Sequence, residues 1–137
     1  MKKVMCFGTF DLLHLGHLHY FKEAKKNGDY LIVVIARDVT KKKQKKEILF
    51  SEKERLELIQ NLSLVDEAVL GYPDDHYRII EEKKPHVLCL GYDQRIDEKK
   101  LAEALAKRGL FPLIKRISPY RTKKHKTSLL RERVLKL

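Results

Sequence analysis

Short apolar runs alternate with amphipathic segments along the whole chain. Five of these runs predict strands, at residues 4–7, 30–36, 67–70, 87–90 and 110–117. The segments after them have apolar residues at three- and four-residue spacing and predict helices, at residues 18–27, 51–62, 74–84, 98–109 and from 127 onward. Strands and helices that alternate in this way predict an α/β fold with a doubly wound, parallel, five-stranded sheet.

Residues at the ends of these segments support the same division. Ser51 and Glu54 form a capping box, and Leu56, Ile59 and Leu62 (with Leu58) supply one buried helix face. Asp74 or Asp75 can cap the third helix and Asp97 or Glu98 the fourth, while Thr127 or Ser128 can cap the last. Pro85 and Gly109 are typical helix stops, and Pro112 favours an edge position for the fifth strand.

The length of 137 residues fits a single domain over residues 1–137. No apolar run approaches the ~20 residues that a bilayer span requires, and the first residues do not resemble a signal peptide. We therefore expect a cytoplasmic protein. Cys6 and Cys89 both lie in apolar strand-like runs, so we interpret them as small core residues.

The stretch from Gly8 to His17, sequence GTFDLLHLGH, connects the first strand to the first helix. Such a turn is where doubly wound folds bind ligands, and a helix N-terminus favours phosphate through its unpaired N–H groups. Gly8 permits a close backbone approach to a ligand, and His14 and His17 lie on one face of the first helical turn. Gly16 between them adds no side chain that could block access. We expect a phosphate-binding pocket here, although two solvated or capping histidines remain the alternative.

The net charge of +11 favours polyanionic partners, and lysines are concentrated in the sequence KKKQKK at residues 41–46. Like charges at this density repel each other, so we expect a mobile loop. Because it follows the second strand, it is expected to lie at the carboxyl edge of the sheet, close to the Gly8–His17 turn. The alternative is a solvated connector without a ligand.

His14-Leu15-Gly16-His17 has the H-x-G-H form of the nucleotidyltransferase superfamily, and Gly8-Thr9-Phe10-Asp11 resembles its G-x-F-D lead-in. The resemblance extends over nearly the whole chain. Arg121-Thr122 with Thr127-Ser128, and the lysines at 43–46, resemble glycerol-phosphate cytidylyltransferases, although residues 123–126 depart from that pattern. The sequences GYDQ at 91–94 and RISPY at 116–120 resemble archaeal-type FAD synthases instead.

The resemblance implies a Rossmann-like nucleotidyltransferase fold and an enzyme that transfers a nucleotidyl group from a nucleoside triphosphate to a phosphorylated acceptor, with release of pyrophosphate. We favour ATP and FMN as substrates and FAD as the product. The first alternative is a cytidylyltransferase that uses CTP and a small phosphorylated alcohol such as glycerol 3-phosphate. An alternative of another class is a basic nucleic-acid-binding module, which leaves the H-x-G-H motif unexplained.

The same resemblance implies roles for individual residues. The expected catalytic residues are His14, His17, Lys43 and Lys46. The expected nucleotide-binding residues are Gly8, Thr9, Phe10, His14, Leu15, Gly16, His17, Asp93, Tyr120, Arg121, Thr127 and Ser128. The expected acceptor-binding residues are Asp11, Asp38 and Tyr92.

The expected metal cofactor is Mg²⁺ or another divalent cation, held mainly by the phosphates and without a definite protein ligand. Asp11 could instead orient a histidine or a water, bind magnesium, or cap the turn. Tyr92, Tyr120 and Phe10 are candidate stacking surfaces for a flat ring. We expect neither a nucleic acid nor a membrane as partner, and a homodimer is left open.

Overall fold

The computed structural model describes residues 1–120, which contain five strands and five helices. In chain order these are β1 (Lys3–Gly8), α1 (Leu15–Lys25), β2 (Tyr30–Ile35), α2 (Asp38–Lys43), α3 (Glu52–Gln60), β3 (Glu67–Leu70), α4 (Arg78–Lys83), β4 (Val87–Leu90), α5 (Glu98–Ala106) and β5 (Leu113–Arg116). No helix in this part of the chain has both the length and the apolar character needed to cross a membrane.

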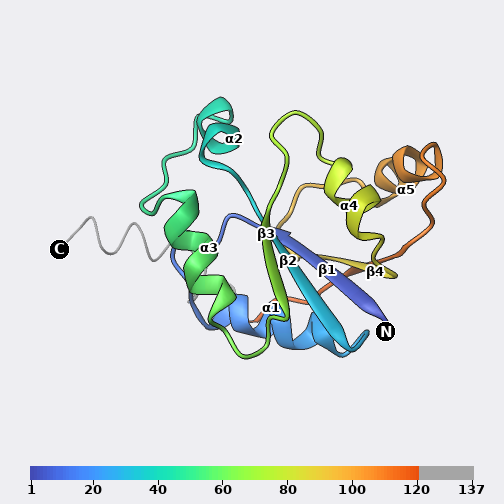
Figure 1. Ribbon diagram of the computed structural model, residues 1–137, viewed down its shortest axis with the longest axis horizontal. Helices are drawn as coiled ribbons and strands as arrows, with labels where there is room; N and C mark the ends of the chain where they lie inside the picture. The colour runs from blue at the N-terminus through green and yellow to red at the C-terminus, as the bar shows by residue number, and fades with distance from the viewer. Residues whose placement is uncertain (121–137) are drawn as a thin grey trace.

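All five strands are parallel and lie in the order β3-β2-β1-β4-β5, which confirms the predicted doubly wound sheet (Figure 1). β1 lies at the centre and pairs with β2 on one side and β4 on the other. The chain therefore reverses its direction of winding between β1 and β4, and folds of this type bind ligands beyond that point. β5 forms an edge, as Pro112 predicts.

The helices cover the sheet in two layers, with α1 and α3 on one face and α4 and α5 on the other (Figure 1). Phe21 of α1 and Ile59 of α3 are fully buried against one face, and Leu105 of α5 is fully buried against the other. β1 and β2 are apolar at nearly every position because they are covered on both faces. Cys6 and Cys89 are buried, free thiols in register on β1 and β4, as expected of core residues.

Several helix ends follow the sequence signals. Ser51 and Glu54 form the predicted capping box of α3, and the Asp97 carboxylate accepts hydrogen bonds from the N–H groups of Lys99 and Lys100 at the start of α5. Gly109 adopts a positive φ of 76° after α5, a conformation that glycine adopts at little cost.

Other expectations were wrong in detail. α4 begins at Arg78 without a side-chain cap, whereas Asp75 accepts a hydrogen bond from the Tyr77 N–H in the preceding turn. β5 is shorter than predicted, and Leu58 is 49% exposed, so it does not belong to the buried face of α3. The predicted last helix lies outside the described residues.

The lysine-rich segment is not the loop that its charge predicted, because its first half is the helix α2. α2 and α3 cap each other: the Asp38 N–H donates to Glu52 Oε1 at 2.9 Å, and the Glu52 N–H donates to Asp38 Oδ2 at 3.1 Å. Each carboxylate therefore satisfies a backbone donor at the N-terminus of the other helix. This reciprocal pair outweighs the repulsion among the lysines that follow.

A single buried guanidinium holds the carboxyl edge of the sheet together. Arg55 on α3 is 1% exposed. Its nitrogens donate to the carbonyl oxygens of Thr9 at 2.9 Å, Ala36 at 2.7 Å and Phe50 at 3.1 Å, and Nη2 pairs with Asp38 Oδ1 at 2.7 Å. Arg55 thus joins the loop after β1, the end of β2, the start of α2 and the segment before α3.

We predict that Arg55→Met lowers the free energy of unfolding by ~3 kcal/mol, since the apolar side chain leaves several polar groups without their buried partner. Lys53→Met on the same helix is the matched control, because Lys53 is exposed and the substitution removes the same charge. Urea denaturation of both variants measures the difference. Equal midpoints for the two would show that the Arg55 contacts do not stabilise the fold.

Candidate active site

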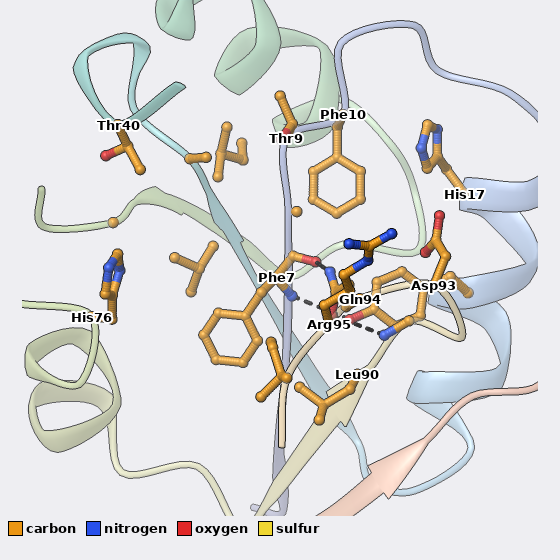
Figure 2. Close-up of a pocket in the computed structure, with 18 of the residues that line it drawn as sticks. Phe7, Thr9, Phe10, His17, Thr40, His76, Leu90, Asp93, Gln94 and Arg95 are labelled. Carbon is orange, nitrogen blue, oxygen red and sulfur yellow. Dashed lines mark hydrogen bonds between the residues drawn. The ribbon is translucent and has the colours of Figure 1, made fainter. Parts of the chain in front are cut away.

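A cleft of about 1580 Å³ opens at the carboxyl ends of the strands (Figure 2). Its floor is formed by the ends of β1, β2 and β4, and its rims by α2, the start of α1 and the loops after β3 and β4. The predicted site residues that line this cleft are Gly8, Thr9, Phe10, Asp11, His14, Gly16, His17, Lys46, Tyr92, Asp93 and Tyr120. Leu15, Lys43 and Asp38 are not among the lining residues, and Arg121, Thr127 and Ser128 lie outside the described residues.

Gly8 and Phe10 shape the floor together. Phe10 has a φ of 55°, which turns the chain back so that its ring lies over Gly8. A Cβ atom on residue 8 would lie 2.5 Å from Phe10 Cζ, so only glycine fits beneath this ring. The ring is 4% exposed and meets His17 edge-on, with the ring centroids 5.3 Å apart. The Phe10 ring therefore supports His17, and its role as a surface for a ligand ring stays a prediction.

His14 and His17 cap the helix α1 with their imidazole rings. His14 is the N-cap residue, and its Nδ1 accepts a hydrogen bond from the Gly16 N–H at 3.0 Å. The His14 N–H in turn donates to Nδ1 of His17 at 3.2 Å, and the two rings stack with centroids 3.9 Å apart. A neutral imidazole that accepts at Nδ1 carries its proton on Nε2. The caps therefore assign the tautomer in which each ring donates from Nε2.

The electrostatics of His17 favour this neutral form. Burial, and then the charge of the adjacent His14, lower the pKa of His17 from 6.5 to about 3. His17 is consequently uncharged at pH 7 and acts as a hydrogen-bond donor rather than as a cation. A phosphate oxygen is the kind of acceptor that such donors suit.

Further donors and charges surround the same place. Within residues 1–120, the backbone N–H groups of Thr9 and Phe10, both in the cleft wall, donate to no protein acceptor. Lys41 and Lys46 of the lysine-rich segment line the rim. Partial burial, Lys46 and Arg55 lower the pKa of Lys41, which indicates a site where positive charge is in excess. An anion bound there would relieve that excess.

The turn after β4 is fixed from both sides. Gln94 Nε2 donates to the Phe7 carbonyl at 2.6 Å, and its Oε1 accepts from the Gly91 N–H at 3.0 Å. The guanidinium of Arg116 on β5 donates to the carbonyl oxygens of Gly91, Gln94 and Ile96. Figure 2 shows Asp93 and Arg95 extending from this turn into the cleft.

The carboxylates of Asp11 and Asp38 both have structural partners. Asp11 is 3% exposed, and its oxygens accept hydrogen bonds from the N–H groups of Leu49 at 2.7 Å and Phe50 at 2.8 Å. Asp38 binds Arg55 and caps α3. Asp11 thus holds the segment between α2 and α3 against the loop after β1, and Asp38 joins α2 to α3. Any role of either residue toward an acceptor stays a prediction.

The sequence analysis missed several residues that build the cleft. His19 was given no role, yet its Nε2 lies 3.1 Å from the Ser118 carbonyl and its ring stacks on Tyr120. Arg55 and Arg116 were not singled out either. The four-residue spacing of Arg55 and Ile59 was the one local signal that could have indicated a buried arginine. No local pattern points to the others, because their partners are far away in the sequence.

Comparisons with known proteins agree with this geometry. The chain matches the cytidylyltransferase-like family over residues 5–133. It is 44% identical to the FAD synthase of Thermoplasma volcanium and 43% identical to that of Thermoplasma acidophilum, in each case over 100% of this chain and 96% of the relative.

A solved structure supports the fold in detail. The crystal structure of the lipopolysaccharide core biosynthesis protein from Thermoplasma volcanium aligns with a TM-score of 0.86 and 48% identity, over 88% of this chain and 98% of that chain. The residues matched to the family include the H-x-G-H turn and the strand ends that line the cleft. This chain belongs to the cytidylyltransferase-like family of nucleotidyltransferases.

Proposed function

We propose that the protein is an FMN adenylyltransferase, which transfers AMP from ATP to FMN and releases pyrophosphate. The observation that carries the proposal is the stacked pair of imidazoles, each capped at Nδ1 by a backbone N–H, which lines a basic cleft. The choice of FMN as acceptor is supported by the relatives named FAD synthase, which match this chain from end to end. The turn at residues 91–94 supports the same choice through its resemblance to that branch.

In this reaction a phosphate oxygen of FMN attacks the α-phosphorus of ATP. A new P–O bond forms, the bond between the α-phosphorus and the bridging oxygen breaks, and pyrophosphate leaves with that bonding pair. Because the attacking phosphate is already anionic, the protein needs no general base. Its task is to position the reactants and to stabilise the charge that develops on the phosphate oxygens.

His14 and His17 are the catalytic residues of this proposal. Their Nε2–H groups donate to oxygens of the α- and β-phosphates, and one donor of this kind is worth roughly 2.7–4 kcal/mol. The N–H groups of Thr9 and Phe10 hold the triphosphate, and Lys41 and Lys46 neutralise it. Lys43, which was expected in this role, has no place in the cleft wall.

Magnesium fits the site through the substrate rather than through the protein. Within residues 1–120, no group of three histidine, cysteine or carboxylate side chains could hold a metal ion, and the oxygens of Asp11 already accept two hydrogen bonds. The ion would therefore be carried mainly by the phosphates, where it supplies charge neutralisation. Since both proposed substrates are water-soluble metabolites, the proposal includes a cytoplasmic location.

An assay of pyrophosphate release tests the proposed function. The purified protein, with magnesium, is offered FMN or glycerol 3-phosphate, each paired with ATP and with CTP. We expect release with ATP and FMN, with FAD as the second product identified by chromatography. Release only with CTP and glycerol 3-phosphate would show that the protein is a cytidylyltransferase instead.

The catalytic role of the histidines has its own test. His14→Ala and His17→Ala should each lower turnover by ~10²-fold or more, because each removes a donor to the developing charge. His86→Ala is the matched control, since His86 is exposed and does not line the cleft. Urea denaturation must show that the variants are folded, and turnover within a few-fold of the wild type in both would remove the histidines from the mechanism.

The low pKa of His17 predicts a pH dependence of stability. The unfolded chain binds a proton at this residue near pH 6.5, whereas the folded protein does so only near pH 3. The free energy of unfolding should therefore decrease as the pH falls from about 6.5 toward 3. Glutamine does not titrate, so His17→Gln should show a smaller decrease in the free energy of unfolding than the wild type. The control variant His76→Gln, at an exposed position, should show the same decrease as the wild type. Parallel curves for all three proteins would contradict the assigned protonation state.

A further inference from the structure

The cleft continues beyond the histidines onto the other face of the sheet. Phe10, which supports His17, packs with the core on the α1 and α3 side. Phe7, Val34 and Ile80 also line the cleft but pack with the core on the α4 and α5 side. Figure 2 shows Thr40 and His76 on the side of the cleft away from His17 and Asp93. We call this second part, lined by Phe7, Val34, Ile80 and Leu90 with Thr40 and His76 at its rim, the apolar bay.

The cleft is large enough to hold a second ligand beside a nucleotide. A pocket for one drug-sized molecule occupies ~300–1,000 Å³, and this cleft measures about 1580 Å³. The donors around His14 and His17 account for a triphosphate at one end. None of the six residues that define the apolar bay is a lysine or an arginine, which does not favour a second phosphate there.

The surfaces of the bay suit a flat aromatic ring with one polar edge. Phe7 is half-buried and contributes an aromatic face, and the apolar side chains of Val34, Ile80 and Leu90 also line the cleft. At the rim, neither the His76 ring nor the Thr40 hydroxyl has a hydrogen-bond partner among residues 1–120. Apolar walls with a few polar groups at one side are typical of sites for such ligands. A small phosphorylated alcohol would leave these surfaces unfilled.

We propose that the apolar bay is the subsite for the tricyclic ring of the flavin acceptor. The inference rests on the proposed function and assigns the acceptor's ring to residues other than Tyr92, Asp11 and Asp38. The ring packs on Phe7, its polar edge faces Thr40 and His76, and the ribityl chain passes over Gly8 at the end of β1. The FMN phosphate then reaches the histidine side of the cleft, where the α-phosphate of ATP is held.

The test fills the bay and leaves His14, His17 and the loop of Thr9 and Phe10 unchanged. Thr40→Trp places a large side chain at the rim of the bay, and Val39→Trp is the matched control because Val39 lies on the same helix, is 43% exposed and does not line the cleft. Phe7→Leu is a second variant that removes only the aromatic face. Binding of FMN and of riboflavin is followed by quenching of flavin fluorescence, and binding of a non-hydrolysable ATP analogue by calorimetry.

We expect Thr40→Trp to raise the Kd for both flavins roughly ten-fold or more, and Phe7→Leu to raise it roughly three- to ten-fold. The Kd of the ATP analogue should stay within about two-fold in both variants, and Val39→Trp should change neither ligand. Riboflavin lacks the phosphate, so its binding to the wild type and its loss in Thr40→Trp report on the ring alone.

Failure of the inference about the apolar bay can be distinguished from failure of the proposed function. If the wild type binds FMN and makes FAD while both variants bind flavin as tightly as the wild type, the bay is not the flavin subsite and the proposed function stands. The inference is equally overturned if the variants lose ATP binding as much as flavin binding. If the wild type binds neither flavin and releases no pyrophosphate with FMN, the proposed function itself is wrong.

Discussion

The guanidinium of Arg55 joins four parts of the chain that lie up to 46 residues apart. Its partners are three backbone carbonyls and one carboxylate, and these groups come from the segments that end β1 and β2 and that flank α2 and α3. A buried arginine is stable only where its donors find good acceptors, so the fold must bring these segments to fixed positions. The loop that carries Thr9 and Phe10 is consequently held from behind, and the side toward the cleft is left for a ligand.

The hydrogen-bond donors of His14 and His17 are also held in fixed positions. Each Nδ1 is occupied by a backbone N–H of the helix start, so the position of the ring and the position of its proton are set together. Because burial keeps His17 neutral, the site can donate to phosphate without first losing or gaining a proton. In the proposed mechanism, the positive charge that a triphosphate requires comes instead from Lys41 on α2 and from Lys46 just after that helix, both of which line the cleft. The histidines at the start of α1 thus orient the phosphates in this mechanism, and the lysines in and just after α2 neutralise their charge.

The sheet could be predicted from the sequence because its strands are buried on both faces and are therefore nearly continuous apolar runs. The turn that carries the histidines could be predicted because its signal is local, within ten residues. The helix α2 could not, since its N-terminus is capped by Glu52, fourteen residues away, while the local pattern showed only repelling lysines. The partners of His19 and Arg116 are likewise brought near by the fold alone. Local patterns predicted the residues of the candidate site, whereas the contacts that fix its geometry are long-range.

The contact between Gly8 and Phe10 restricts the substitutions that this protein can accept during evolution. Any larger residue at position 8 would push the Phe10 ring outward, and that ring is what holds the edge of His17. A substitution at either position would thus disturb the imidazole without altering it. The two positions form a linked pair with His17, and a lineage could replace one of them only together with a compensating change in the others.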